Sequence, residues 1–315
     1  MNATLSQRNQ KRAGMKNYFS RYWILYLMLG LPILYFIIFK YIPFIYIQIA
    51  FKDYKIGISP WEMPVADNYG FEYFLRAFRN RDFVYALRNT IMLNSLDLIV
   101  GFPAPIILAI ILNEVRNKYF KRLTQTIAYL PHFLSWIIIS GLALQVFAPS
   151  TGLVNLALNS LGFESQPFLN NPRMWVAVYV LLGVWQSVGW NTIIYLAAIT
   201  GINTELYEAA EVDGAGRFRK IWHITLPGLR PTIIVLLILA LGRMLGIEFD
   251  RPFSLQNNLV KSVSNVLSTF VYTNGIRGLQ ISMTTAVGLF QSVVNVLFLT
   301  AANFFAKRMG EQGIW

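Results

Sequence analysis

The sequence contains no cysteine, and only two of its 315 residues are histidines. The absence of cysteine excludes disulfide bonds, thiolate metal sites and a cysteine nucleophile. His132 and His223 stand far apart in the sequence, so the histidines alone cannot form a metal site. We therefore expect no metal centre in this chain.

Sequence signatures of catalysis are also missing. No glycine is followed directly by lysine, which excludes the phosphate-binding Walker loop. The HExxH signature of zinc peptidases and the GxSxG signature of serine hydrolases do not occur either. The chain is therefore predicted not to hydrolyse ATP and not to be an enzyme. A membrane-embedded enzyme is the alternative that these absences count against.

Charged residues are scarce, at 13%, whereas 55% of the chain is apolar and its mean hydropathy is positive. Such a chain has more apolar surface than a soluble core can bury, which indicates an integral membrane protein. The formal net charge of +12 is compatible with nucleic-acid binding. However, the basic residues are scattered through loops and form no stripe on one element, so the membrane interpretation is favoured.

Long apolar runs predict an all-α integral membrane protein with six transmembrane helices. The predicted spans cover residues 22–51, 90–112, 127–147, 175–200, 232–249 and 284–305. The first run exceeds the roughly 20 residues that cross a bilayer, so this helix is expected to tilt or to project beyond the outer face. The run is also too long for a signal peptide and is followed by no suitable cleavage site, so we expect it to be retained.

The basic residues predict the orientation of the spans. Residues 1–21 contain five basic residues and no acidic one, which places the N-terminus in the cytoplasm. Six spans then place the C-terminus there too. The predicted organisation is a cytoplasmic N-terminus (1–21), a first helix with an external segment (22–89), a five-helix core (90–305) that includes a cytoplasmic loop (203–231), and a cytoplasmic tail (306–315).

The loop at 203–231 is the one polar segment between two apolar runs that carries its own helix-cap and turn signals. Asn203 is suited to cap a first helix, and Gly214 stands where a left-handed residue would end it. A second helix follows and is expected to break at Pro227 and Pro231 before the next span begins. The sequence thus predicts two short helices joined by a glycine turn. On shape alone, a plain connecting loop remains an alternative.

Residue identities in this loop resemble the EAA signature of the membrane subunits of bacterial ABC importers, the MetI-like family. The matching positions are Glu208, Ala209, Ala210, Gly214, Ile224, Leu226 and Pro227. In that family this loop is the coupling helix, which seats in a groove of a separate ATPase subunit. The resemblance therefore implies an ATPase-coupling role for these seven residues.

Further segments resemble the carbohydrate permeases of this family, in particular the branch for polysaccharides and complex oligosaccharides. They are FEYFLRAF at 71–78, ALRNT at 86–90, GFPAPIILAIILNE at 101–114, LPHFLSW at 130–136, PSTGLVN at 149–155 and EQGIW at 311–315.

The resemblance implies a multi-pass permease in the bacterial cytoplasmic membrane that moves oligosaccharides or polysaccharide fragments by alternating access. It also implies a second permease subunit, usually a different chain, two ATPase subunits that hold ATP and Mg, and an extracytoplasmic solute-binding protein. No cofactor is expected on this chain. The alternatives are a permease for another solute and a six-span channel that works without an ATPase.

Polar and aromatic residues inside the spans are candidates for the substrate path, because such groups are costly in lipid. The fourth span combines flat rings with amides, a combination that can stack on sugar rings and bond their hydroxyls. These candidates are Trp185, Gln186, Trp190, Asn191 and Tyr195. Packing between helices is the alternative. Asp97 in the second span is a further candidate, with a structural bond to a neighbouring helix at least equally favoured.

The fifth predicted span carries two arginines and two acids, Arg243, Glu248, Asp250 and Arg251. Their spacing favours pairing among themselves along one helix. The alternative is that the arginines bind an acidic sugar, and Arg251 is therefore included in the predicted path. An apolar stripe at 71–78 fits either a helix on the outer membrane surface or a helix packed on the spans.

Overall fold

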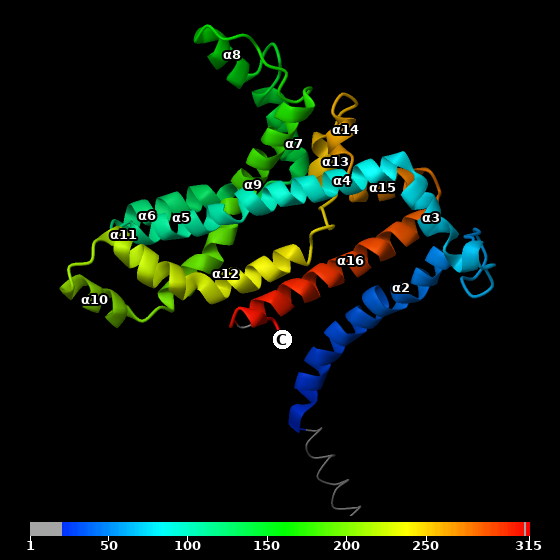
Figure 1. The fold of residues 1–315 in the computed structure, drawn as a ribbon, viewed down its shortest axis with the longest axis horizontal. Helices are drawn as coiled ribbons and strands as arrows, with labels where there is room; N and C mark the ends of the chain where they lie inside the picture. The colour runs from blue at the N-terminus through cyan, green and yellow to red at the C-terminus, as the bar shows by residue number, and fades with distance from the viewer. Residues whose placement is uncertain (1–20, 312) are drawn as a thin grey trace, which may run out of the picture.

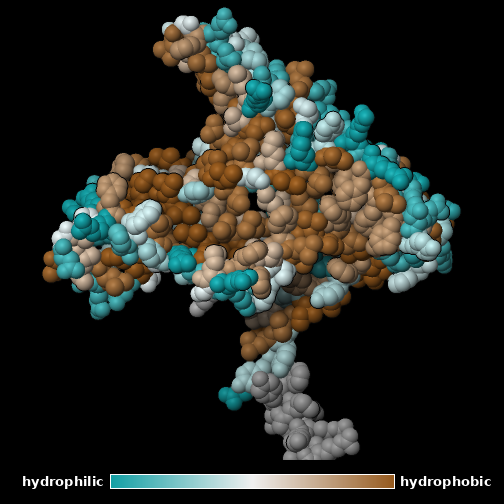
Figure 2. All heavy atoms as spheres, in the orientation of Figure 1, coloured by the Kyte–Doolittle hydropathy of each residue, from teal (hydrophilic) through white to brown (hydrophobic). Residues whose placement is uncertain are grey.

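The computed structural model describes residues 21–311 and 313–315, and within these residues the chain is helical apart from loops and one isolated bridge between Lys52 and Val65. Five helices are long and apolar enough to cross a membrane, or six if one bent pair counts as a span, within the part described. Figure 2 shows apolar side chains over the middle of the molecule and hydrophilic ones at its edges. The prediction of a helical chain with several helices long and apolar enough to cross a membrane is confirmed.

The first long helix covers residues 21–51 and stands apart from the others (Figure 1). It includes a π-helical turn (η1, Ile37–Tyr41), a short segment (α2, Ile42–Phe44) and a 3-10 end (η2, Ile45–Phe51). Residues 23–46 are exposed, whereas the 3-10 end packs, chiefly against α16 (Ile281–Arg308). The Ser282 hydroxyl donates to the Lys52 carbonyl at 2.7 Å and accepts from the Tyr54 amide at 2.9 Å. The predicted span is confirmed.

Helix α3 (Glu72–Arg79) carries the apolar stripe and packs on η2 and α16. Phe51 contacts the rings of Phe71 and Phe74, with centroids 5.5 and 5.3 Å apart. The ring of Phe78 lies 5.1 Å from that of Phe290 on α16. Of the two predicted positions, the structure therefore shows the helix packed on the spans.

The second long helix begins nine residues before the predicted start, at Arg81, and consists of α4 (Arg81–Leu96), a π-helical turn (η4, Asp97–Gly101) and α5 (Pro103–Glu114). The Asn80 side chain caps it by accepting from the amides of Asp82 and Phe83, which explains the early start. The wide π turn precedes Pro103, the first residue of α5, where a missing amide hydrogen interrupts no regular bond.

The predicted third span is not one straight helix. Helix α6 (Lys118–Tyr129) is followed by a 3-10 turn (η5, Leu130–Phe133) and then by α7 (Trp136–Val146), bent by 103° from it. Pro131 lies in the turn, and the Ser135 hydroxyl accepts from the Ile138 amide to begin α7 afresh. A proline and a new N-cap within five residues end one helix and start another. An amphipathic segment, α8 (Leu153–Ser160), follows.

Helix α9 (Pro172–Thr200) is the centre of the fold and confirms the predicted fourth span. Its residues enter two separate apolar clusters, one with Trp175 and Tyr179 and another with Tyr195 and Ile199. A side chain at Gly189 would overlap the Ala128 carbonyl of α6, so glycine lets the two backbones approach closely.

The predicted break before the fifth span is wrong. Helix α11 (Arg217–Lys220), a π-helical turn (η6, Ile221–Thr225) and α12 (Leu226–Leu241) form one continuous helix. The Leu226 amide bonds the Ile221 carbonyl across the wide turn, and Pro227 falls in the first turn of α12, where its missing hydrogen is tolerated. Pro231 stands farther along, inside α12.

The predicted fifth span at 232–249 ends too late. The helix stops at Leu241, and residues 242–249 form turns and extended chain before α13 (Asp250–Leu255). Short helices then lead to the last span: α14 (Lys261–Ser264), α15 (Leu267–Val271) and a π turn (η7, Tyr272–Arg277). Helix α16 confirms the predicted sixth span. The tail folds back, with Glu311 paired to Arg230 at 2.6 Å.

Candidate functional site

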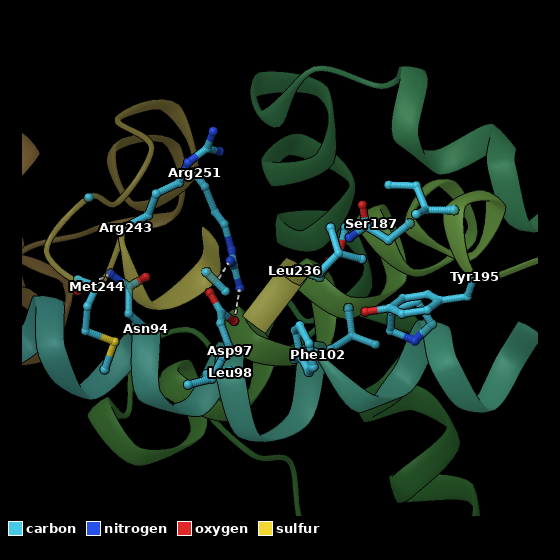
Figure 3. A pocket seen from close by; sticks show the side chains of 18 residues that line it. Asn94, Asp97, Leu98, Phe102, Ser187, Tyr195, Leu236, Arg243, Met244 and Arg251 are labelled. Carbon is cyan, nitrogen blue, oxygen red and sulfur yellow. Dashed lines mark hydrogen bonds and ion pairs between the residues drawn. The ribbon is translucent and has the colours of Figure 1, made fainter. Parts of the chain in front are cut away.

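A cavity of about 350 Å³ lies where the chain leaves α12, between this connection, the π turn η4 and helix α9 (Figure 3). Most of its lining residues come from three long helices that are distant in sequence. A smaller cavity of about 180 Å³ shares Asp97, Gly183 and Arg251 with it and adds Trp136 and Gln186. Polar and charged side chains from several helices line these two spaces.

Arg251 and Asp97 form an ion pair at the wall shared by both cavities. Arg251 donates to the two Asp97 carboxylate oxygens at 2.7 and 3.1 Å, in the forked geometry that binds a carboxylate most strongly (Figure 3). Its Nη2 also donates to the Tyr179 carbonyl at 2.7 Å, and the guanidinium lies 3.7 Å from the Tyr179 ring centroid. The guanidinium also lies 5.3 Å from the ring centroid of Trp136, so four elements, η4, α7, α9 and α13, meet at one side chain.

The prediction that the residues at 243–251 pair among themselves is wrong. Within the described residues no ion pair joins Arg243, Glu248, Asp250 and Arg251 to one another. The reason is that residues 242–249 are not helical, so the spacing that aligns side chains on a helix does not apply. The bond predicted from Asp97 to a neighbouring element is present, with Arg251 as the donor.

Gly183 makes the approach of Arg251 possible. A side chain at this position of α9 would overlap the Arg251 guanidinium, so only a hydrogen leaves room for it. Gly183 begins a row of small and polar residues at four-residue intervals that faces the cavity: Gly183, Ser187, Asn191 and Tyr195. The spacing is that of one helix face.

The predicted path residues divide into two groups. Asn191, Tyr195, Asp97 and Arg251 line the larger cavity, and Gln186 lines the smaller one. Trp190 instead stacks on His132 of the turn η5, with ring centroids 4.6 Å apart and planes 5° from parallel. Trp185 is exposed on the outside of α9 and lines neither cavity. The structure thus brings together the amides and the charged pair and leaves the two tryptophans elsewhere.

Sequence reasoning missed Gly183 and Ser187, although both precede Asn191 at multiples of four residues. That spacing is the signal that would have identified them. It also left Asn94 without a role; its amide donates to the Met244 carbonyl at 2.7 Å and thereby holds the non-helical connection against α4.

The loop between α9 and α12 forms the second candidate site. Helix α10 (Thr204–Val212) begins at Asn203, whose side chain accepts from the Glu205 amide, and ends before Gly214, which has a φ of +70°. Both predictions for these residues are confirmed. The Tyr207 hydroxyl bonds that of Thr225 at 2.9 Å, which ties α10 to the turn η6.

The predicted coupling residues lie on this hairpin. Glu208, Ala209, Gly214 and Pro227 are exposed, whereas Ala210, Ile224 and Leu226 are half-buried. Large apolar side chains are exposed beside them, including Phe218 at 90% and Val212 at 89%. An ion pair between Lys220 and Glu211 at 2.9 Å braces the hairpin, and the hydrogen bond from Lys220 lowers the pKa of the Glu211 carboxyl. A surface of this kind is suited to contact with another protein.

Curated relatives are similar to the chain over nearly its whole length. It is 45% identical to the protein LplB of Bacillus subtilis over 291 residues, which cover 92% of this chain and 91% of that protein. It is 43% identical to the polygalacturonan/rhamnogalacturonan transport system permease protein YteP of the same organism, with 92% and 90% covered.

Solved structures are also similar to the chain over nearly its whole length. The chain is 38% identical, with a TM-score of 0.85, to a bacterial ABC transporter involved in the import of the acidic polysaccharide alginate; the match covers 94% of this chain and 99% of that one. Residues 101–311 match the family described as binding-protein-dependent transport system inner membrane components. With two thirds of its length in this match and relatives above 40% identity, the chain belongs to that family of inner membrane transport components.

Proposed function

We propose that the chain is the permease subunit of an ATP-driven importer that carries oligosaccharides or polysaccharide fragments across the bacterial cytoplasmic membrane. The observation that carries the proposal is the combination of an exposed helical hairpin at 203–225 with a polar cavity between the long helices, at the far end of the helix 217–241 that leads from this hairpin. The relatives named above, a polygalacturonan permease and an alginate importer, support saccharide as the cargo.

The mechanism we propose is alternating access. The second half of the hairpin and α12 belong to one continuous helix at 217–241, about 25 residues long. A displacement of the hairpin is therefore transmitted along this helix to the cavity. The helix ends at Leu241, beside the connection that carries Arg243 and Arg251. Movement of α12 therefore shifts the cavity wall relative to α9, and the energy for it comes from a separate ATPase that seats on the hairpin.

The partners in this proposal are a second permease subunit, two ATPase subunits with their ATP and Mg, and an extracytoplasmic solute-binding protein. A solved structure of a bacterial alginate ABC transporter is a complex with an alginate pentasaccharide-bound periplasmic protein, and the chain matches this transporter with a TM-score of 0.86. The EAA positions and the exposed Phe218 and Trp222 are the surface we assign to the ATPase.

Uptake of a labelled oligosaccharide into proteoliposomes tests the function. We expect uptake only when the second permease, the ATPase and the binding protein are all present. ATP must also be supplied on the side of the membrane that carries the ATPase. Omission of the ATPase should reduce uptake to the level of empty vesicles. Uptake down a gradient without the ATPase would contradict the proposal and identify a channel instead.

Topology gives a second, independent test. We propose that both chain ends and the loop 203–231 lie in the cytoplasm and that the segment around Asn170 lies outside. A reporter enzyme that is active only outside the membrane should be active when fused after Asn170 and inactive when fused after Gly216. Activity of the second fusion would place the hairpin outside, where no ATPase can reach it.

A further inference from the structure

The polar side chains that line the larger cavity fall into two groups. One group is bonded within the protein: Arg251 to Asp97, Asn94 to the Met244 carbonyl and Ser187 to the Gly183 carbonyl. The other group comprises Arg243, Asn191 and Tyr195, whose side chains make no hydrogen bond or ion pair within residues 21–311 and 313–315. The second group is therefore available to a ligand.

The larger cavity carries one positive charge without an ion-pair partner, and Glu248 lines only the smaller cavity. The forked bond from Arg251 to Asp97 cancels both of those charges locally. Arg243 has no carboxylate within 4.0 Å among the described residues, although Glu248 and Asp250 belong to the same connection. In Figure 3 its side chain has no dashed line to any residue drawn, in contrast to Arg251.

Arg243 lines the larger cavity with an exposed side chain and has no acidic partner within 4.0 Å among the described residues, so an anion that enters the cavity can bind it. Arg243 follows directly on the end of α12, and its backbone is fixed by bonds from its amide to the Ala240 carbonyl and from the Gly246 amide to its own carbonyl. Its guanidinium is therefore presented from an ordered turn, on the element that the proposed mechanism moves. The anion must enter and leave with the transport cycle, which points to the cargo.

We propose that Arg243 binds the carboxylate of a uronate residue in the transported oligosaccharide, while Asn191 and Tyr195 bond neighbouring hydroxyl groups. The inference rests on the proposed function and names its substrate class as acidic saccharides. A guanidinium fork matches a carboxylate with two parallel hydrogen bonds, which a neutral sugar hydroxyl cannot provide. The Tyr195 hydroxyl is directed into the cavity from α9, opposite the connection that carries Arg243 (Figure 3).

The test compares uronate trisaccharides with their carboxyl-reduced, neutral counterparts in the complete reconstituted complex. Trisaccharides of galacturonate and of mannuronate are the probes, and the readout is the ratio of acidic to neutral uptake. For Arg243→Gln we expect this ratio to fall roughly ten- to hundredfold, the change that loss of a hydrogen bond to a charged group produces. Arg243→Lys retains the positive charge but lacks the forked pair of donors, so its ratio of acidic to neutral uptake should lie between those of the wild type and Arg243→Gln.

Arg173→Gln is the matched control, because Arg173 is exposed near the start of α9 and lines neither cavity. It removes the same charge from the chain and should leave the ratio unchanged. An unchanged ratio in Arg243→Gln, or an equal fall for acidic and neutral sugars, would overturn the inference. So would a wild-type complex that takes up neutral oligosaccharides only. Failure of the proposed function differs from all three, since the wild type would then take up no saccharide with ATP.

Discussion

Replacing Arg251 by methionine is expected to destabilise the protein by about 3 kcal/mol, the lower end of the range for removing one partner of a buried ion pair. Methionine keeps an unbranched apolar chain but leaves the Asp97 carboxylate without its counter-charge. Only 12% of the Arg251 side chain and 29% of the Asp97 side chain are exposed, so water cannot fully replace the lost bonds. Thermal unfolding of the purified protein in detergent measures the change.

The double variant Asp97→Asn with Arg251→Met separates charge from packing. It removes both charges, so most of the lost stability should return if the unpaired carboxylate is the cause. If the double variant is as unstable as Arg251→Met alone, the bond from Arg251 to the Tyr179 carbonyl and its contact with the Tyr179 ring carry the stability instead. The single variant Asp97→Asn completes the cycle.

Valine at Gly214 is expected to leave the protein in the membrane but to reduce ATP-dependent uptake and copurification of the ATPase about tenfold. Gly214 has a φ of +70°, a conformation that a β-branched residue adopts only at a cost of roughly 1–2 kcal/mol. An added Cβ would meet no atom within 4 Å, so steric contact does not contribute. The strain is relieved by re-aiming the helices on either side, and the exposed hairpin surface is then misplaced.

Gly216 offers a control two residues away. Its φ of −68° is open to any residue, and an added Cβ there also meets open space. Gly216→Val should therefore retain uptake and ATPase binding close to those of the wild type. Equal losses in both variants would show that the hairpin surface tolerates no added side chain, and normal activity in Gly214→Val would show that the turn is only a linker.

Local sequence signals predicted the parts of the fold that depend on neighbouring residues. The helix cap at Asn203, the positive φ at Gly214 and the long apolar helix α9 are each specified within a few residues of sequence. The positions at which helices end were predicted less well. Pro227 was expected to end a helix, but a π-helical turn just before it lets the helix continue. Conversely, Pro131 and Ser135 together break the third span by 103°.

The candidate site was predicted only in part. The reason is that it depends on contacts between residues that are distant in sequence. Arg251 and Asp97 are separated by 154 positions, so no local spacing could pair them. Both were nevertheless selected as costly residues inside spans, as were Asn191 and Tyr195. Trp190 lines neither cavity, because its ring stacks on His132, and a flat ring stacks as readily on another ring as on a sugar.

The isolation of the first helix has a consequence for the order in which the molecule is assembled. Its contacts with the rest of the chain involve Ser282, which is separated from Lys52 and Tyr54 by 230 and 228 positions. During synthesis the first helix is thus inserted long before α16 exists, and it waits in the bilayer until the last span emerges. The contacts of Phe51 with Phe71 and Phe74 can form early, whereas packing on α16 must wait for closure of this long loop, which completes the bundle.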